Sequence, residues 1–440
     1  MLLFIAFIIL HFVLLQQIKD SISKFVLWSF FLVWSVAIII SQFGFYGLNI
    51  PKDRTILYIS IHLLSFYAGF FIVNQKKSNQ KLHLKEIESS LENRAFKIVY
   101  NKFFLALLAV LLLYVISLYL KMQALLAVTQ SLGEVRNAYF EENLFGPYYY
   151  FINLFVLTPV SCLLLFVWGY MTLKKKNILW VVIGLFLFLY FSLGGGRIGY
   201  FKIFISLVLV WQIFSGGHKK RIRVFDRRTL YIGALGVALY FLIIFTTAAR
   251  MGNVSGNQSF ADEYVEETNT QLLSYYVGPI AAFDYALEND YVSKNGGYKY
   301  GALTFSSIEE ILYIGVLRLN RDYKRPISEY SKLIQHNIIW IGDGITWNAL
   351  FTWCLYFYLD LGVAGLILFP FIFGIIIRKI IFYCYNNPNL YSLSILCFFY
   401  VDLMISVLKY SWQSFSLILM LVFFFYMSNK SRKRIIVTKK

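Results

Sequence analysis

Long apolar runs recur along almost the whole of this chain. A helix needs about 20 apolar residues to cross a bilayer, and many of these runs approach or exceed that length. Hydrophobic residues make up 59% of the 440 residues and charged residues only 15%, and the mean hydropathy is +0.64. Backbone polar groups must be satisfied within each span in lipid, which favours helices over open strands. The sequence therefore predicts an all-α polytopic membrane protein rather than a soluble chain with a large core.

Eleven transmembrane helices are predicted from these runs. The chain begins MLLFIAFIILHFVLLQQ, without the basic start and small-residue cleavage site of a signal peptide, so its first run is expected to be a retained helix. The predicted spans are about 2–17, 25–42, 55–74, 99–120, 151–173, 178–193, 198–214, 229–249, 355–377, 390–408 and 414–427.

The connections between these spans alternate in their content of lysine and arginine. Basic connections stay on the cytoplasmic side of a membrane. This rule explains the formal net charge of +18 better than binding to nucleic acid does. It places the C-terminus in the cytoplasm and the N-terminus outside, together with the poorly basic connections 43–54, 121–150, 194–197 and 409–413. The predicted cytoplasmic segments carry 25 of the 41 basic residues and are 18–24, 75–98, 174–177, 215–228, 378–389 and 428–440.

The predicted architecture has four parts. They are eight helices in residues 1–249, an outer loop at 250–345, three helices in residues 346–428, and a basic cytoplasmic tail at 429–440. The outer loop carries 8 basic and 12 acidic residues. Its stretches 262–290 and 306–320 have amphipathic helical patterns, so we expect a folded helical cap on the bundle.

Two arginines lie at the outer ends of predicted spans. Gly196 and Arg197 belong to the tight turn FSLGGGRIGYFK at the start of a helix, a place that suits an anion. Arg250, in FTTAARMGN, lies at the end of the predicted span that precedes the outer loop. Arginine binds phosphate with two parallel hydrogen bonds, so Arg197 and Arg250 are candidate ligands of a lipid-linked pyrophosphate. The alternatives are an arginine that snorkels to water and a charge favoured by the helix dipole.

The outer loop and its return to the membrane supply the other candidate residues. Asp284, in an apolar setting, and His336, the loop's single histidine, are the candidate general bases. Each also has a structural alternative, since a loop carboxylate or histidine is often a surface group. Asp360 is open to a further alternative, the capping of the next helix. Glu309, Glu310 and Arg318 are interpreted as solvated surface, with Arg318 kept as a candidate. The candidate substrate-binding residues are Gly196, Tyr276, Arg318, Asn348, Tyr358 and Asp360.

Four stretches, taken in order, resemble the Wzy-type O-antigen polymerase family. They are GGGR at 194–197, AAR at 248–250, YYVGPIAAFDYAL at 275–287 and WNALFTWCLYFYLDLGVAG at 347–365. Part of that family carries arginine motifs with a glycine eleven positions on. Here Arg197 is followed at that spacing by Val208, and Arg250 by Ala261.

The resemblance implies a metal-independent glycosyltransferase of the bacterial inner membrane, with its outer loop in the periplasm. Such an enzyme polymerises undecaprenyl-pyrophosphate-linked oligosaccharide repeats of O-antigen, capsule or exopolysaccharide. It transfers the growing chain to a sugar hydroxyl of the next lipid-linked repeat. The resemblance implies no cofactor and no metal. The partners that it implies are the lipid substrate, a chain-length regulator and a flippase. The alternatives are a ligase-like glycan transferase, for which an essential loop histidine is expected, and a flippase for the lipid-linked repeat. The sequence has no Walker A motif, so ATP-driven work is not indicated.

Overall fold

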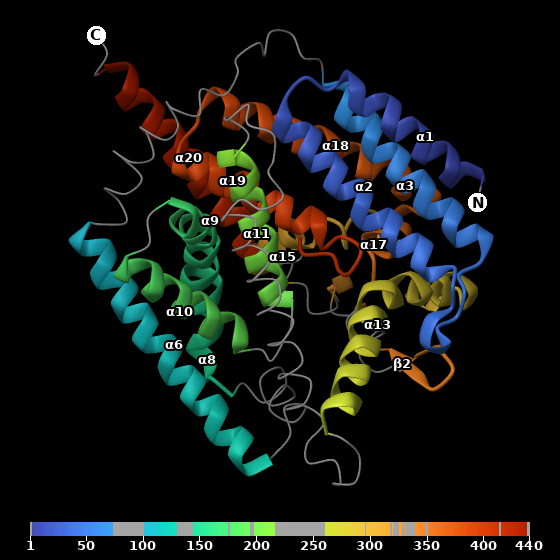
Figure 1. Ribbon diagram of the computed structural model, residues 1–440, viewed down its shortest axis with the longest axis horizontal. Helices are drawn as coiled ribbons and strands as arrows, with labels where there is room; N and C mark the ends of the chain where they lie inside the picture. The colour runs from blue at the N-terminus through green and yellow to red at the C-terminus, as the bar shows by residue number, and fades with distance from the viewer. Residues whose placement is uncertain are drawn as a thin grey trace. The chain divides into compact units, whose positions relative to one another are not determined.

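The computed structural model of this protein is almost entirely helical in the part of the chain that it describes (Figure 1). It describes residues 2–73, 101–129, 144–174, 177–193, 198–215, 260–294, 296–316, 319, 325–327, 330, 339–347, 351–412 and 415–437. The first helices are α1 (Leu2–Gln17), α2 (Ser21–Ser41), the short 3₁₀ helix η1 (Phe45–Gly47), α3 (Asp53–Ile72) and α6 (Lys102–Thr129). Next come α8 (Pro147–Ile152), the π-helical turn η3 (Asn153–Leu157), α9 (Thr158–Lys174), α10 (Ile178–Ser192) and α11 (Ile198–Ser215).

The rest of the chain holds the elements of the predicted outer loop and the last helices. These are α13 (Phe260–Glu288), α14 (Tyr291–Lys294), α15 (Ser306–Gly315), β1 (Ile339–Gly342), β2 (Ile345–Trp347), α17 (Trp353–Leu361), α18 (Val363–Asn386), α19 (Leu390–Met404) and α20 (Phe415–Val437).

Several of these helices have the length and composition of membrane spans. Within the described ranges five qualify: α2, α3, α6, Phe155–Leu173 and α18. Shorter apolar helices occur at Phe4–Gln17, Ile178–Ser192, Ile198–Phe214, Leu390–Met404 and Leu417–Lys430. The chain is thus a helical membrane protein. The predicted span 229–249 lies outside the described residues.

The limits of the predicted span 355–377 are wrong, because the helix is interrupted within this range. Gly362 ends α17 with φ 60° and ψ −139°, a conformation that glycine adopts with little strain. α18 then starts at Val363 and runs to Asn386. The helix with the length and composition of a membrane span is therefore α18, and α17 is a separate helix of nine residues.

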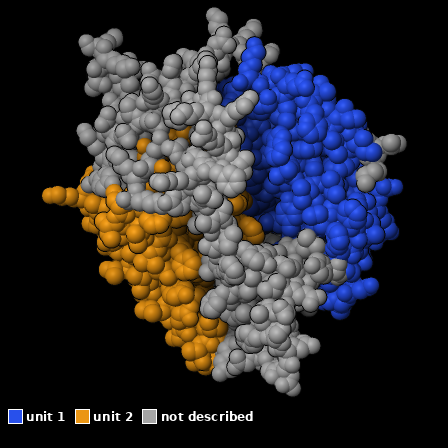
Figure 2. All heavy atoms as spheres, in the orientation of Figure 1, with its two compact units in different colours: residues 1–81, 270–386, 402–422 blue, residues 82–269, 387–401, 423–440 orange. Residues whose placement is uncertain are grey.

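The chain divides into two compact units, coloured separately in Figure 2. One unit comprises residues 82–269, 387–401 and 423–440. In it α9 packs against α10 and α11, and α10 also packs on α6. Asn177 caps α10 by accepting a hydrogen bond from the Trp180 N–H (3.2 Å). The Trp180 ring stacks on that of Trp168 at 6.0 Å between centroids and fastens α10 to α9.

The other unit comprises residues 1–81, 270–386 and 402–422. Helices α1, α2 and α3 lie side by side in it (Figure 1), and α18 packs along α3. The α3–α18 crossing is very close: a Cβ on Gly69 would collide with the carbonyl oxygen of Phe371, and one on Gly374 with that of Phe66. Small residues permit this approach, as is usual between membrane helices.

The predicted outer loop contributes both helices and a hairpin to this unit, which is unit 1 in Figure 2. The expected helix at 262–290 is observed as α13, and the one expected at 306–320 as the shorter α15. The antiparallel pair β1–β2 was missed by the all-helical prediction. Its signal was the Asp343–Gly344 turn between apolar residues, with Gly344 at φ 71°.

Replacing Gly69 by leucine is expected to lower the unfolding temperature of the detergent-solubilised protein, because the new side chain would meet the α18 backbone. Overpacking of this kind costs about 1–3 kcal/mol. Ala68→Leu is the matched control, since Ala68 precedes Gly69 on the same helix and is exposed. Equal unfolding temperatures for the two variants would contradict the close crossing.

Candidate functional site

An arginine and three tyrosines gather where the start of α3 meets the end of α17. We call Arg54, Tyr58, Tyr298 and Tyr358 the Arg54 cluster. The Arg54 Nε donates to the Tyr58 hydroxyl (3.2 Å) and its Nη2 points to the Tyr358 hydroxyl (3.4 Å). The guanidinium also lies 5.2 Å from the centroid of the Tyr58 ring. The two rings are 5.7 Å apart, so the three side chains form one continuous group.

Tyr298 joins this group from the loop that follows α14. Its hydroxyl lies directly over Gly362, where an ideal Cβ would come within 2.9 Å of that oxygen. The glycine that breaks α17 from α18 therefore also makes room for Tyr298. Its side chain is exposed, as is that of Arg54, whereas Tyr58 and Tyr358 are half-buried.

The charge of Arg54 has no carboxylate partner among the residues that the structure describes. Its neighbours are phenol hydroxyls, which do not neutralise a guanidinium. A guanidinium can donate two parallel hydrogen bonds to the oxygens of a phosphate or pyrophosphate. The tyrosine rings beside it offer flat apolar faces on which a sugar ring can stack. The Arg54 cluster thus has the chemistry to bind an anionic glycan.

Asp284, a predicted general base, lies directly behind this cluster. It is buried on α13, and its Oδ1 accepts hydrogen bonds from the Lys52 N–H (3.0 Å) and from the Thr55 hydroxyl. Lys52 is the N-cap residue of α3, so the carboxylate accepts from a backbone N–H at the start of a helix that is distant in sequence. The ring of the neighbouring Phe283 packs edge-on against that of Tyr358, with 6.3 Å between the ring centroids. This placement favours an anchoring role for Asp284, with proton transfer still a prediction.

Asp360 holds the segment that carries Tyr298. It is fully buried, and its two carboxylate oxygens accept from the N–H groups of Leu303 (3.0 Å) and Thr304 (2.7 Å). Its own carbonyl accepts from the Tyr300 N–H at 3.0 Å. Burial raises the pKa of Asp360, and the hydrogen bonds from Leu303 and Thr304 oppose that rise. Asp360 therefore positions a loop rather than capping the next helix.

The loop held by Asp360 presents a second exposed tyrosine. Tyr300 has φ 51°, a left-handed conformation that costs a non-glycine residue free energy, and its side chain is 81% exposed. Gly297 and Gly301 flank the segment with φ 87° and 93°. The backbone contacts of Lys299 and Tyr300 to α17 thus hold this segment at the surface, with Tyr300 two residues after Tyr298 of the Arg54 cluster.

Tyr276, a predicted substrate-binding residue, is used for packing. Its hydroxyl donates to the carbonyl of Val33 in α2, and burial raises its pKa. It lies eight residues before Asp284 on α13, about 12 Å along the helix axis. It therefore fastens α13 to α2 away from the Arg54 cluster.

The structure brings together some of the predicted residues and does not describe others. Asp284 of α13 and Tyr358 of α17 lie near the start of α3, and Asp360 of α17 holds the loop that carries Tyr298. Gly196, Arg197, Arg250, Arg318, His336 and Asn348 lie outside the described residues, and their roles stay predictions.

Arg54 and Tyr58 were missed by the sequence interpretation. Arg54 and Tyr58 are spaced i, i+4 on α3, which puts them on one helix face and is the available signal. The residues 43–54 were also predicted to lie outside the membrane. Tyr358 comes from about 300 positions further along the chain, and no local pattern links it to Arg54.

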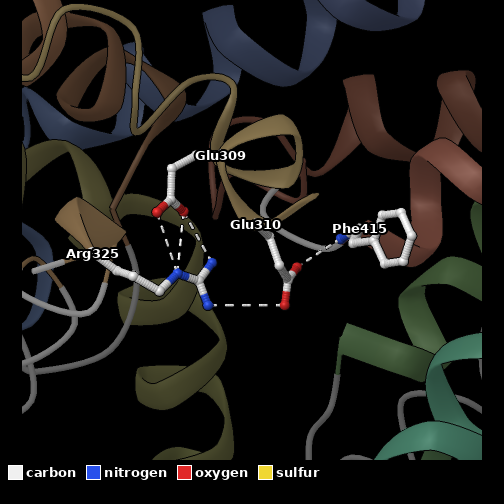
Figure 3. A network of polar contacts seen from close by, with 4 residues as sticks. All are labelled: Glu309, Glu310, Arg325 and Phe415. Carbon is white, nitrogen blue, oxygen red and sulfur yellow. Dashed lines mark hydrogen bonds and ion pairs between the residues drawn. The ribbon is translucent and has the colours of Figure 1, made fainter. Parts of the chain in front are cut away.

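The interpretation of Glu309 and Glu310 as solvated surface is wrong. Figure 3 shows both carboxylates turned toward Arg325. Arg325 donates from Nε and Nη2 to Glu309 Oε2 (3.2 and 3.0 Å), and its Nη1 is 3.9 Å from Glu310 Oε1. Glu310 Oε2 accepts from the Phe415 N–H (2.9 Å) at the start of α20. The two side chains are only 7% and 8% exposed, so this is an internal network.

Comparison of the sequence with models of protein families, with curated proteins and with solved structures finds no match.

Asp360→Asn is expected to lower the unfolding temperature and to increase protease cleavage after Lys299. An amide keeps one acceptor oxygen and turns an NH₂ group toward a buried backbone N–H, a loss of about 1–3 kcal/mol. Asp343→Asn is the matched control, because Asp343 is exposed at the hairpin turn. Indistinguishable behaviour of the two variants would contradict the positioning role of Asp360.

Proposed function

We propose that this membrane protein polymerises undecaprenyl-pyrophosphate-linked oligosaccharide repeats on the periplasmic face of a bacterial inner membrane. The observation that carries the proposal is the exposed Arg54, without a carboxylate partner in the described part of the chain and set among tyrosines. The charge pattern of the sequence predicts that this end of α3 faces outward. The resemblance to Wzy-type polymerases supplies the reaction.

The first requirement of that reaction is a site for the leaving group. The acceptor hydroxyl oxygen attacks the anomeric carbon of the donor, and the bond from that carbon to the pyrophosphate oxygen breaks. The electron pair leaves with undecaprenyl pyrophosphate, whose added negative charge must be stabilised. In the proposal Arg54 shares this task with Arg197 and Arg250. No nucleotide is needed, because the donor arrives already activated.

The second requirement is a proton acceptor for the hydroxyl. A base within hydrogen-bond reach of that oxygen accelerates such a step. The sequence candidates are Asp284 and His336. Asp284 lies next to the Arg54 cluster, and its Oδ1 already accepts two hydrogen bonds. In the proposal the choice between the two residues stays open.

The third requirement is a surface for the sugars. Tyr298 and Tyr300 are exposed on the loop that Asp360 holds. Tyr58 and Tyr358 lie beside the Arg54 guanidinium and accept its hydrogen bonds. Rings of this kind provide apolar contact area with few rotatable bonds to order. In the proposal the tyrosines bind the repeat next to its pyrophosphate.

Arg54→Ala is expected to convert a long glycan ladder into single-repeat products when the variant replaces the chromosomal copy in its host. Loss of one charge-stabilising group commonly lowers a rate about 10²–10³-fold. Arg197→Ala and Arg250→Ala are expected to act in the same way. The measurement is gel electrophoresis of surface glycan, with protein amount checked by immunoblot.

Two variants serve as controls for that experiment. Arg54→Lys retains the charge but loses the planar fork, so partial ladders of reduced length are expected. Lys294→Ala removes an exposed positive charge from the same outer segment and should leave the ladder unchanged. Full ladders from the alanine variants of Arg54, Arg197 and Arg250, all at normal protein amounts, would overturn the proposal.

A further inference from the structure

The short helix α15 has its polar side chains buried and its apolar side chains exposed. Ser306 and Ser307 are buried, as are Glu309 and Glu310. The outward residues are large and apolar: Phe305 just before the helix, Ile308 (47% exposed), Ile311 and Leu312 (53%). At about 100° per residue the two sets fall on opposite faces of the helix. The polarity is the reverse of that of a helix lying on a protein in water.

The two buried carboxylates of α15 both have partners inside the protein. Glu309 is bonded to Arg325, and Glu310 accepts from the first backbone N–H of α20 (Figure 3). Arg325 also lies 5.1 Å from the centroid of the Tyr313 ring, on the same inner side. Buried carboxylates are costly unless paired in this way. These inner contacts set the orientation of α15. Its apolar face therefore lies on the surface of the protein and needs surroundings in which apolar side chains are stable.

One ring contact places the start of α15 beside a candidate membrane span. The Phe305 ring packs edge-on against Phe369 of α18, with 5.7 Å between centroids. Phe369 lies six residues after the first residue of α18, about 9 Å along the axis of a candidate membrane span. Next to it on α18, Ile367 and Leu368 are exposed apolar residues. The start of α15 thus lies level with the interior of a membrane span.

The exposed apolar surface also continues past the end of α15. Val316 and Leu319 follow at helical spacing and are among the most exposed apolar residues of this segment, at 64% and 77%. An outward set of this size would be unfavourable in water, at roughly 25 cal/mol for each Å² exposed. Lipid chains solvate such side chains without that cost.

We propose that the outer face of α15, formed by Phe305, Ile308, Ile311 and Leu312 and extended by Val316 and Leu319, is embedded in the acyl chains of membrane lipid. The helix lies within one leaflet, with its charged residues turned inward to the protein. The predicted outer loop is then partly a membrane-immersed element rather than a cap in water. The proposal stands whether or not the protein is a polymerase.

Photo-crosslinking can identify what covers this face. Benzoylphenylalanine is introduced at Ile308 and, in a second variant, at Leu312 of the full-length protein in phosphatidylglycerol vesicles. Irradiation is expected to yield adducts to phospholipid acyl chains at both positions, read by mass spectrometry. The same residue at Lys294, which is exposed on α14, is the control and should give little or no lipid adduct.

The remaining outcomes contradict the proposal. Crosslinks between two copies of the chain would make this face a protein interface. The absence of any adduct at both positions, in variants with the elution profile and unfolding temperature of the native protein, would place it in water. Because each variant changes an exposed side chain, two independent positions guard against a single misfolded variant.

Discussion

The close crossing of α3 and α18 is the constraint on which the site-bearing unit depends. Backbone meets backbone at Gly69 and Gly374, so the two spans have little freedom to slide or rotate against each other. The starts of α3 and α18 are therefore held in a fixed position relative to each other. Because α17 ends at Gly362, immediately before α18, the Tyr358 hydroxyl is delivered to the side of Arg54. A contact within the bundle thereby determines a surface arrangement at its end.

Two buried carboxylates attach the predicted outer loop to this pair of helices. Asp284 of α13 satisfies the first turn of α3, and Asp360 of α17 satisfies backbone N–H groups just before α15. Both link elements far apart in sequence, and in both the carboxylate accepts hydrogen bonds that the chain would otherwise leave unmade. Their sequence settings, an acid among apolar residues, resemble those of a catalytic group. Their observed bonds show why burial alone does not distinguish a base from an anchor.

The parts of the fold set by local pattern were predictable, and those set by distant contacts were not. Apolar runs gave α1, α10 and α11 to within a residue or two, and an amphipathic period gave α13. The break at Gly362 was missed because hydropathy runs through it, and the hairpin at Asp343–Gly344 because its strands are short. Glu309 and Glu310 were misassigned because a helical period shows which residues share a face and not whether that face meets lipid, water or Arg325. The Arg54 cluster joins residues that no spacing rule connects.

The proposed function requires the Arg54 cluster to bind the pyrophosphate of a lipid-linked glycan. The most direct measurement is the dissociation constant of undecaprenyl pyrophosphate for the purified protein and for Arg54→Ala, by native mass spectrometry in detergent. Loss of a bidentate charged contact is expected to weaken binding at least tenfold, with no change for the Lys294→Ala control. Equal dissociation constants for the native protein and Arg54→Ala would contradict the account.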